Sequence, residues 1–190
     1  MKTVLRAMKV MLMALTLAVT LAGGGAPAAL AQLPAGVELG PKVGMKAPAF
    51  SVMSGSGETR TFETLKGRRG LVLVFVRSAD WCPFCKVQLQ DLNSVAMDLA
   101  ALGWPMVAVS YDSTETLQRF STANKLAYDL LSDPGSKAID AFGIRNESVK
   151  GSARFNGIPH PLIVFIGADG MVRAKLYEHR YQDRPPSGLV

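Results

Sequence analysis

The two cysteines of this 190-residue chain, Cys82 and Cys85, are separated only by a proline and a phenylalanine. Thiols at this spacing can attack a disulfide or a peroxide and then close on each other, because the second sulfur reaches the intermediate within one molecule. A ring closed over two residues removes little entropy from the unfolded chain, so stabilisation explains the pair poorly. The sequence therefore predicts redox chemistry, with Cys82 as the nucleophile and Cys85 as the resolving thiol.

A metal site is the main alternative, because a Cys-x-x-Cys pair is also half of a zinc site. The chain has no second such pair, and its two histidines, His160 and His179, are 19 residues apart. We keep a non-catalytic copper or zinc carrier that uses both cysteines and His160 as a hypothesis. The preferred interpretation needs neither a metal nor a cofactor.

The cysteines fall where a strand is expected to end and a helix to begin. The apolar run from Leu71 to Val76 predicts a strand buried on both faces. Apolar residues at three- and four-residue steps predict an amphipathic helix over 83–102, with Pro83 in its first turn. The free N–H groups of that turn favour a thiolate at Cys82, and Lys86 is a candidate modulator of its pKa. Trp81, Pro83 and Phe84 are candidates for the docking surface around the sulfurs.

Other segments predict an α/β domain with a central mixed sheet flanked by helices. A short N-terminal hairpin is expected from 49–53 and 59–61, and a C-terminal hairpin from 162–166 and 171–177. A second buried strand is expected over 106–110, and helices over 114–124 and 137–142. The expected domain covers residues 47–177.

Residues 1–31 have the three regions of a secretory signal peptide, with Lys2, Arg6 and Lys9 before an apolar run and a cleavage site after Ala31. We expect a periplasmic or secreted protein without a stable membrane span once the leader is cleaved. Its removal leaves 18 basic and 15 acidic residues, and the basic stretch 66–69 is interpreted as a solvated loop rather than a nucleic-acid site. Residues 32–46 are expected to form an extended arm and 178–190 a mobile tail.

Several motifs together resemble the redoxin, or AhpC/TSA, branch of the thioredoxin superfamily. They are Gly44-x-x-Ala47-Pro48-x-Phe50, the run 71–75, Trp81-Cys82-Pro83-Phe84-Cys85, 157–161 and Asp169-Gly170. The resemblance spans Gly44 to about Tyr177 and implies a thioredoxin-like fold. It also implies a cis-proline opposite the cysteines, best placed at Pro161 with Pro159 as the alternative, which would turn the backbone of His160 toward a substrate. His160 is therefore a docking residue, and either a proton relay and pKa modulator, a copper ligand or an edge residue of the loop.

The sequence departs from the peroxiredoxin pattern, because the expected proline and threonine before the peroxidatic cysteine fall on Phe75 and Ala79. Arg77, however, resembles the arginine before the WCPxC motif of a peroxiredoxin-like group and is a candidate for binding a peroxide oxygen or tuning the cysteines. The preferred function is thiol-disulfide exchange with exported disulfides or thiols, supported by a recycling thiol reductant or oxidant. Thiol-dependent peroxidase activity is the alternative. The direction of electron flow stays open.

Overall fold

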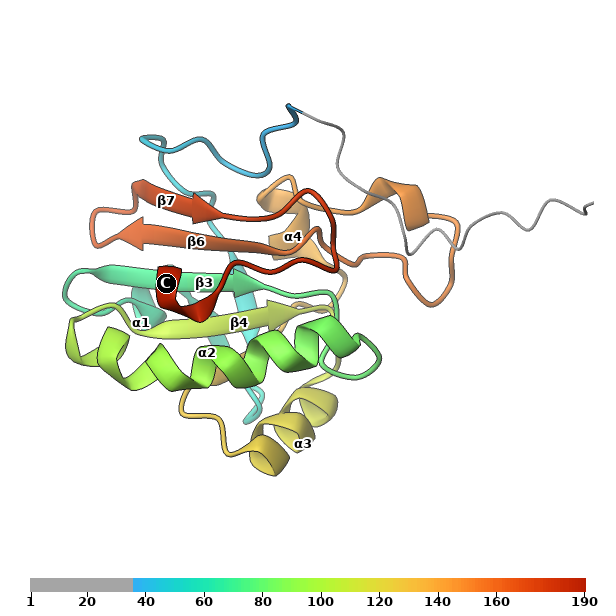
Figure 1. The fold of residues 1–190 in the computed structure, drawn as a ribbon, viewed down its shortest axis with the longest axis horizontal. Helices are drawn as coiled ribbons and strands as arrows, with labels where there is room; N and C mark the ends of the chain where they lie inside the picture. The colour runs from blue at the N-terminus through green and yellow to red at the C-terminus, as the bar shows by residue number, and fades with distance from the viewer. Residues whose placement is uncertain (1–35) are drawn as a thin grey trace, which may run out of the picture.

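The computed structural model describes residues 36–190. The predicted leader at 1–31 and the first residues of the predicted arm, 32–35, lie outside the described residues. A seven-stranded sheet, ordered β2-β1-β5-β4-β3-β6-β7, runs through the domain (Figure 1). The β3–β4 and β4–β5 pairs are parallel and the remaining pairs are antiparallel, so the sheet is mixed as predicted. The strands are β1 (Ser51–Met53), β2 (Thr59–Thr61), β3 (Gly70–Phe75), β4 (Met106–Ser110), β5 (Asp129–Ser132), β6 (Leu162–Gly167) and β7 (Val172–Leu176).

Helices cover both faces of the sheet (Figure 1). One face carries α2 (Pro83–Ala101) and α3 (Thr114–Asn124), and the other carries α1 (Phe62–Leu65) and α4 (Lys137–Ala141). Two 3₁₀ helices, η2 (Glu147–Val149) and η3 (Ser187–Leu189), lie in connecting and terminal segments. This arrangement confirms the predicted α/β fold with an N-terminal hairpin extension.

The central strand β3 is covered on both faces, which explains why apolar and polar residues do not alternate along it. Successive side chains point to opposite faces, so Leu71, Leu73 and Phe75 join one apolar cluster while Val72 and Val74 join the other. All six residues of the strand are buried. Burial of each such side chain contributes about 1.5–3 kcal/mol to folding, which fixes the strand that leads to the cysteines.

Two elements that sequence periodicity does not predict, α1 and β5, have four residues each. A segment this short completes barely one helical turn or two strand repeats, so no period stands out. β5 extends the parallel part of the sheet and connects it to the hairpin, because Ser132 pairs with Ser110 of β4 and with Met53 of β1.

The described part of the N-terminal arm, residues 36–46, contains no helix or strand. It nevertheless pairs with the start of β7. The amide of Gly44 donates to the carbonyl of Val172, the amide of Val172 donates to the carbonyl of Met45, and Lys46 forms an isolated bridge with Met171. These hydrogen bonds cover the outer edge of the sheet.

The C-terminal tail is folded onto the domain, so the prediction of a mobile tail is wrong. It returns across the face of the sheet that carries α2 and ends in η3, which packs against α2 (Figure 1). The Tyr181 ring meets the Phe84 ring edge to face at 5.9 Å, and Pro185 is buried. The proline-rich composition suggested disorder, but the aromatic and proline side chains find an apolar helix face to cover. None of the helices in residues 36–190 combines the length and apolar character needed to span a bilayer.

Candidate active site

The Cys82–Cys85 disulfide stands at the start of α2, just after the end of β3. Cys82 is the N-cap residue and Pro83 follows at the first helical position. The two sulfurs are bonded, with the Cα atoms 5.3 Å apart, and the backbone N–H of Cys85 donates to Cys82 Sγ at 3.3 Å. The predicted contact between one sulfur and the first-turn N–H groups is therefore present. Such donors stabilise a thiolate at Cys82 once the disulfide is reduced.

Both cysteines are closed off from solvent in the disulfide form. Cys82 is 1% exposed and Cys85 is fully buried, whereas the intervening Pro83 and Phe84 are exposed. A large protein substrate would meet Pro83 and Phe84 before it met sulfur. The arrangement suits a small reactant better than the open docking surface that the sequence suggested.

Arg77 is a buried cation in the segment that connects β3 to Cys82. Its side chain is 1% exposed, and its guanidinium carbon lies 5.0 Å from the Trp81 ring centroid and 4.0 Å from that of Tyr181. Nε and Nη2 have no hydrogen-bond partner, and within residues 36–190 no acidic side chain forms an ion pair with it. Burial lowers the pKa of Arg77, yet a guanidinium stays charged in proteins. The site thus holds a positive charge with donors to spare.

A second guanidinium, that of Arg184, reaches the sulfurs from the C-terminal tail. Its Nη2 donates to Cys85 Sγ at 3.4 Å, while Nη1 donates to the carbonyl oxygens of Tyr181 and Asp183. Burial and then the nearby charge of Arg77 lower the pKa of Arg184 to about 10. Sequence reasoning missed Arg184, because it lies about a hundred residues from the cysteines in a segment interpreted as mobile.

A buried carboxylate, Asp112, holds the loop that carries Cys82. Its Oδ1 accepts from the Ser78 hydroxyl at 2.8 Å, and its Oδ2 accepts from the Ala79 amide at 2.7 Å and the Ser110 hydroxyl at 3.0 Å. Burial raises the pKa of Asp112, although these three donors work in the opposite direction. Ser78 Oγ also accepts from the amide of Trp81 at 3.3 Å, which extends the network to the residue before Cys82. No signal in the sequence marked Asp112, which follows a neighbouring strand.

His160 and Pro161 lie at the same edge of the sheet as Arg77. Phe75 pairs with Leu162, so the residues that follow β3 stand opposite those that precede β6. The His160 amide donates to the carbonyl of Ile144 at 2.7 Å. Burial, followed by the charge of Arg77, lowers the pKa of the His160 imidazole, which keeps the ring neutral at pH 7.

The predicted cis-proline is wrong at both positions, because every peptide bond within residues 36–190 is trans. Pro159 instead forms an antiparallel bridge with Arg145, and the Asn146 amide donates to the carbonyl of Ile158. This pairing holds the segment in an extended backbone conformation, which is the conformation favoured by a residue that precedes a proline.

The remaining predicted site residues separate into two groups. Trp81 belongs to the site, since its Nε1 donates to the Tyr111 hydroxyl at 2.9 Å and its ring packs on Phe155. Lys86 lies outside the site, because its side chain lines a hollow with Asp80 and residues of α3. No contact with the sulfurs supports the prediction that Lys86 modulates their pKa. The residue after Cys85 in the helix points about 100° away from it, which explains the separation. Within residues 36–190, no three histidine, cysteine or acidic side chains form a group able to hold a metal ion.

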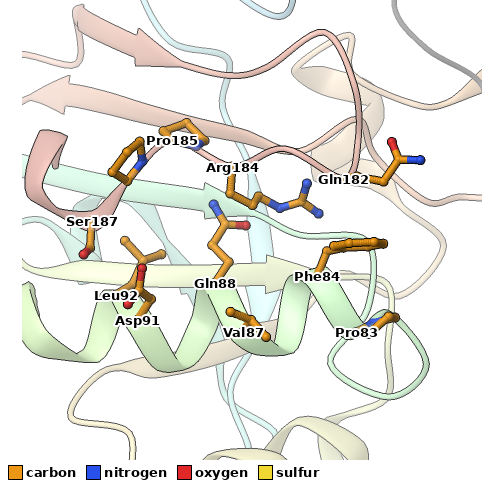
Figure 2. Close-up of a pocket in the computed structure, with 11 residues that line it drawn as sticks. Pro83, Phe84, Val87, Gln88, Asp91, Leu92, Gln182, Arg184, Pro185 and Ser187 are labelled. Atoms are coloured by element: carbon orange, nitrogen blue, oxygen red, sulfur yellow. The ribbon is translucent and has the colours of Figure 1, made fainter.

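A pocket of about 340 Å³ lies between α2 and the tail (Figure 2). Phe84, Val87 and Leu92 line it from the helix, and Arg184 and Pro185 line it from the tail. Figure 2 shows the Arg184 side chain extending roughly along α2, past Gln88 and toward Phe84 in this view. The tail therefore lines one side of the site.

A disulfide at the N-terminus of a helix that follows the central strand of a mixed sheet defines a thioredoxin-like redox protein. The chain belongs to the AhpC/TSA family, whose sequence profile matches residues 43–175. It is 31% identical to peroxiredoxin Bcp of Escherichia coli K12 over 142 residues, which cover 75% of this chain and 86% of that protein.

Solved structures agree on the fold. The crystal structure of peroxidoxin BcpB from Mycobacterium tuberculosis matches with a TM-score of 0.63 at 21% identity, covering 72% of this chain and 85% of that one. The bacterioferritin comigratory protein of Xanthomonas campestris matches with a TM-score of 0.59 at 20% identity, covering 74% and 84%. Arg184 and Tyr181 lie beyond the residues that the family profile matches.

Proposed function

We propose that the protein is a thiol-dependent peroxidase in which Cys82 is the peroxidatic cysteine and Cys85 the resolving one. The observation that carries this proposal is the buried Arg77 side chain, whose Nε and Nη2 have no hydrogen-bond partner, in the segment that leads to two buried sulfurs. A peroxide is small, and its oxygens accept hydrogen bonds from Nε and Nη2. The E. coli relative is named a peroxiredoxin, and the work on the X. campestris protein concerns its alkyl peroxide reduction, which lends further support.

The proposed cycle starts from the reduced dithiol. The Cys82 thiolate attacks one peroxide oxygen, the O–O bond breaks, and the other oxygen leaves as hydroxide or alkoxide and takes up a proton to become water or alcohol. Cys82 is then a sulfenic acid, and the Cys85 thiolate attacks its sulfur to form the disulfide and release hydroxide, which takes up a proton to become water. Arg77 is proposed to stabilise the negative charge that develops on the departing oxygen. An external thiol reductant then restores the dithiol.

Stopped-flow oxidation of the reduced protein tests the proposal. Fluorescence of Trp81, read in a Trp104→Phe background, follows the oxidation by hydrogen peroxide or an organic hydroperoxide. We expect a second-order rate constant of about 10⁴ M⁻¹ s⁻¹ or more, in the range of enzymes. The Cys82→Ser variant is expected to be inert, whereas Cys85→Ser should react once and stop as sulfenic acid. A rate no faster than that of free cysteine would rule out the peroxidase.

Thiol-disulfide exchange, the function preferred from the sequence, is retained as a second candidate. The Cys82–Cys85 disulfide at the N-terminus of α2, with the Cys85 amide donating to Cys82 Sγ, favours this chemistry. Its assay is the reduction of an insoluble or fluorescent disulfide substrate by the dithiol. Exchange at an enzymatic rate, together with slow oxidation by peroxides, would make it the main activity.

The proposed place of action is outside the cytoplasm, on the strength of the leader-like residues 1–31. N-terminal sequencing of the chain expressed in a bacterial host would test this. We expect a mature N-terminus at Gln32 in the periplasmic fraction, and an intact leader on cytoplasmic protein would refute export.

A further inference from the structure

The two sulfurs of the disulfide have different polar partners. Cys82 Sγ accepts from a backbone amide, whereas Cys85 Sγ accepts from a charged guanidinium, that of Arg184. Cys82 is the N-cap residue at the entrance to the helix, and Cys85 lies inside its first turn. The site is therefore asymmetric before any substrate arrives.

Arg184 lacks an anionic partner in the disulfide form. Its Nε has no hydrogen-bond partner, and within residues 36–190 no carboxylate forms an ion pair with it, because the neighbouring Asp183 is engaged by Arg180 at 2.7 and 2.8 Å. Arg77, also unpaired, lies near enough to lower the pKa of Arg184. Two like charges partly withdrawn from water are costly unless an anion joins them.

Reduction supplies such an anion at the right place. When the disulfide opens, the sulfur that now accepts a hydrogen bond from Arg184 gains an electron pair, and a thiolate accepts that bond far more strongly than a disulfide sulfur. We propose that Arg184 is the charge partner of the Cys85 thiolate and makes Cys85 the leaving sulfur when the enzyme is recycled. This inference rests on the proposed function only for its dithiol–disulfide cycle.

The recycling step is then directional. A thiolate of the reductant attacks Cys82 Sγ and forms a mixed disulfide, the Cys82–Cys85 bond breaks, and its electron pair leaves on Cys85 beside Arg184. A second reductant thiolate attacks the reductant sulfur and releases the Cys82 thiolate. The enzyme gains two electrons and the two reductant thiols become a disulfide. A leaving thiol of lower pKa leaves faster, so Arg184 accelerates the first of these steps.

The same contact favours the reduced protein at equilibrium. Whatever stabilises the dithiol over the disulfide makes the disulfide a stronger oxidant. Arg184 is absent from the segment that the family profile matches, so this property belongs to the tail of this chain. It assigns a direction to electron flow that the sequence left open, toward the Cys82–Cys85 disulfide.

Titration of Cys85 alone tests the charge partner without any peroxide. In a Cys82→Ser background, thiolate absorbance against pH is expected to give a Cys85 pKa below the ordinary value of about 8.5. Adding Arg184→Gln should lower the acid dissociation constant of Cys85 about tenfold. Replacing Arg184 by lysine instead should recover part of that loss. The other charged or titratable groups near Arg184 are Arg77, Tyr181 and Asp183, with His160 beside Arg77, and all are unchanged in these proteins.

The equilibrium with glutathione provides the second readout, on otherwise unmodified protein. Arg184→Gln is expected to shift the equilibrium constant about tenfold toward the disulfide, which corresponds to about 30 mV. It should also slow reduction by a small thiol. Glu178→Gln is the control, since Glu178 lies on the same tail, is exposed, and its replacement leaves the pair between Arg180 and Asp183 in place.

An Arg184→Gln protein whose Cys85 pKa and glutathione equilibrium match those of the parent would overturn the proposal. Equal changes in Glu178→Gln would also overturn it, because they would trace the effect to a loosened tail. Failure of the peroxidase assay leaves both readouts intact, so the two proposals fail separately.

Discussion

The loop between β3 and α2 separates two polar regions that could hardly differ more. On one side, Asp112 accepts three hydrogen bonds from the loop and from β4, and each of its oxygens has a partner. On the other side, Arg184 donates to Cys85 Sγ with the charge of Arg77 nearby, and three of the nitrogens of these two guanidinium groups have no hydrogen-bond partner. A buried polar group that is fully satisfied serves the fold, whereas one left unsatisfied marks the place where a reactant or a new charge is expected.

Removing the satisfied carboxylate should have the largest effect on stability. Asp112→Ala leaves the donors of Ser78, Ala79 and Ser110 without an acceptor, and we expect a loss of about 3 kcal/mol in the free energy of unfolding. Urea denaturation measures it. Asp98→Ala, an exposed carboxylate on α2, is the control and should stay within about 0.5 kcal/mol. A small loss in Asp112→Ala would mean that the network does not hold the loop.

Removing the unsatisfied cation should affect activity rather than stability. Arg77→Met replaces an unpaired buried charge with an apolar side chain of similar length, so the free energy of unfolding should stay unchanged or rise by up to about 2 kcal/mol. The rate of reaction with peroxide should fall about 100-fold, as when one donor to a developing oxyanion is lost. Arg173→Gln, an exposed arginine on β7, should alter neither quantity. An Arg77→Met protein that is clearly less stable than the parent but reacts with peroxide at the parent rate would contradict both expectations.

The smallest expected effect is on the pH dependence of stability, to which His160 and Asp112 contribute with opposite signs. The pKa of His160 is lowered in the folded state, so the unfolded chain binds a proton first as the pH falls below about 6.5 and the folded state loses stability there. Asp112, whose pKa is raised, has the opposite sign and favours the folded state as the pH falls toward its unfolded pKa.

His160→Gln should therefore flatten the loss of stability between about pH 7 and pH 5, and Arg77→Met should reduce it, since the charge of Arg77 contributes to the lowered pKa. Urea midpoints across this range measure both effects. His179→Gln, at an exposed position, should leave the slope unchanged. An unaltered slope in His160→Gln would assign the pH dependence to another group.

Most of the fold could be predicted from local pattern, and the reason is visible in individual elements. The long helix α2 carries a clear period, and β3 and β4 are continuous apolar runs that are buried along their whole length. The hairpins are marked by turn residues. What was missed, α1 and β5, is too short to show a period.

The site could be predicted only in part, because its sulfurs lie in one short segment while two of its charged side chains, Asp112 and Arg184, come from elsewhere in the chain. Cys82, Cys85, Trp81 and Arg77 come from one continuous segment. Asp112 and Arg184 reach that segment from a neighbouring strand and from the chain end, and neither residue type nor spacing announces such contacts. Lys86 shows the converse error, since closeness in sequence put it near the sulfurs while the helix turns it toward α3.

The folded C-terminus has a practical consequence for anyone who prepares this protein. Val190 ends the tail segment from which Arg184 donates to Cys85 Sγ, so a purification tag or fusion partner attached there would load the segment that holds this contact. A fragment limited to residues 43–175, which match the family profile, would keep the central strands of the sheet but lose the tail that lines one side of the pocket.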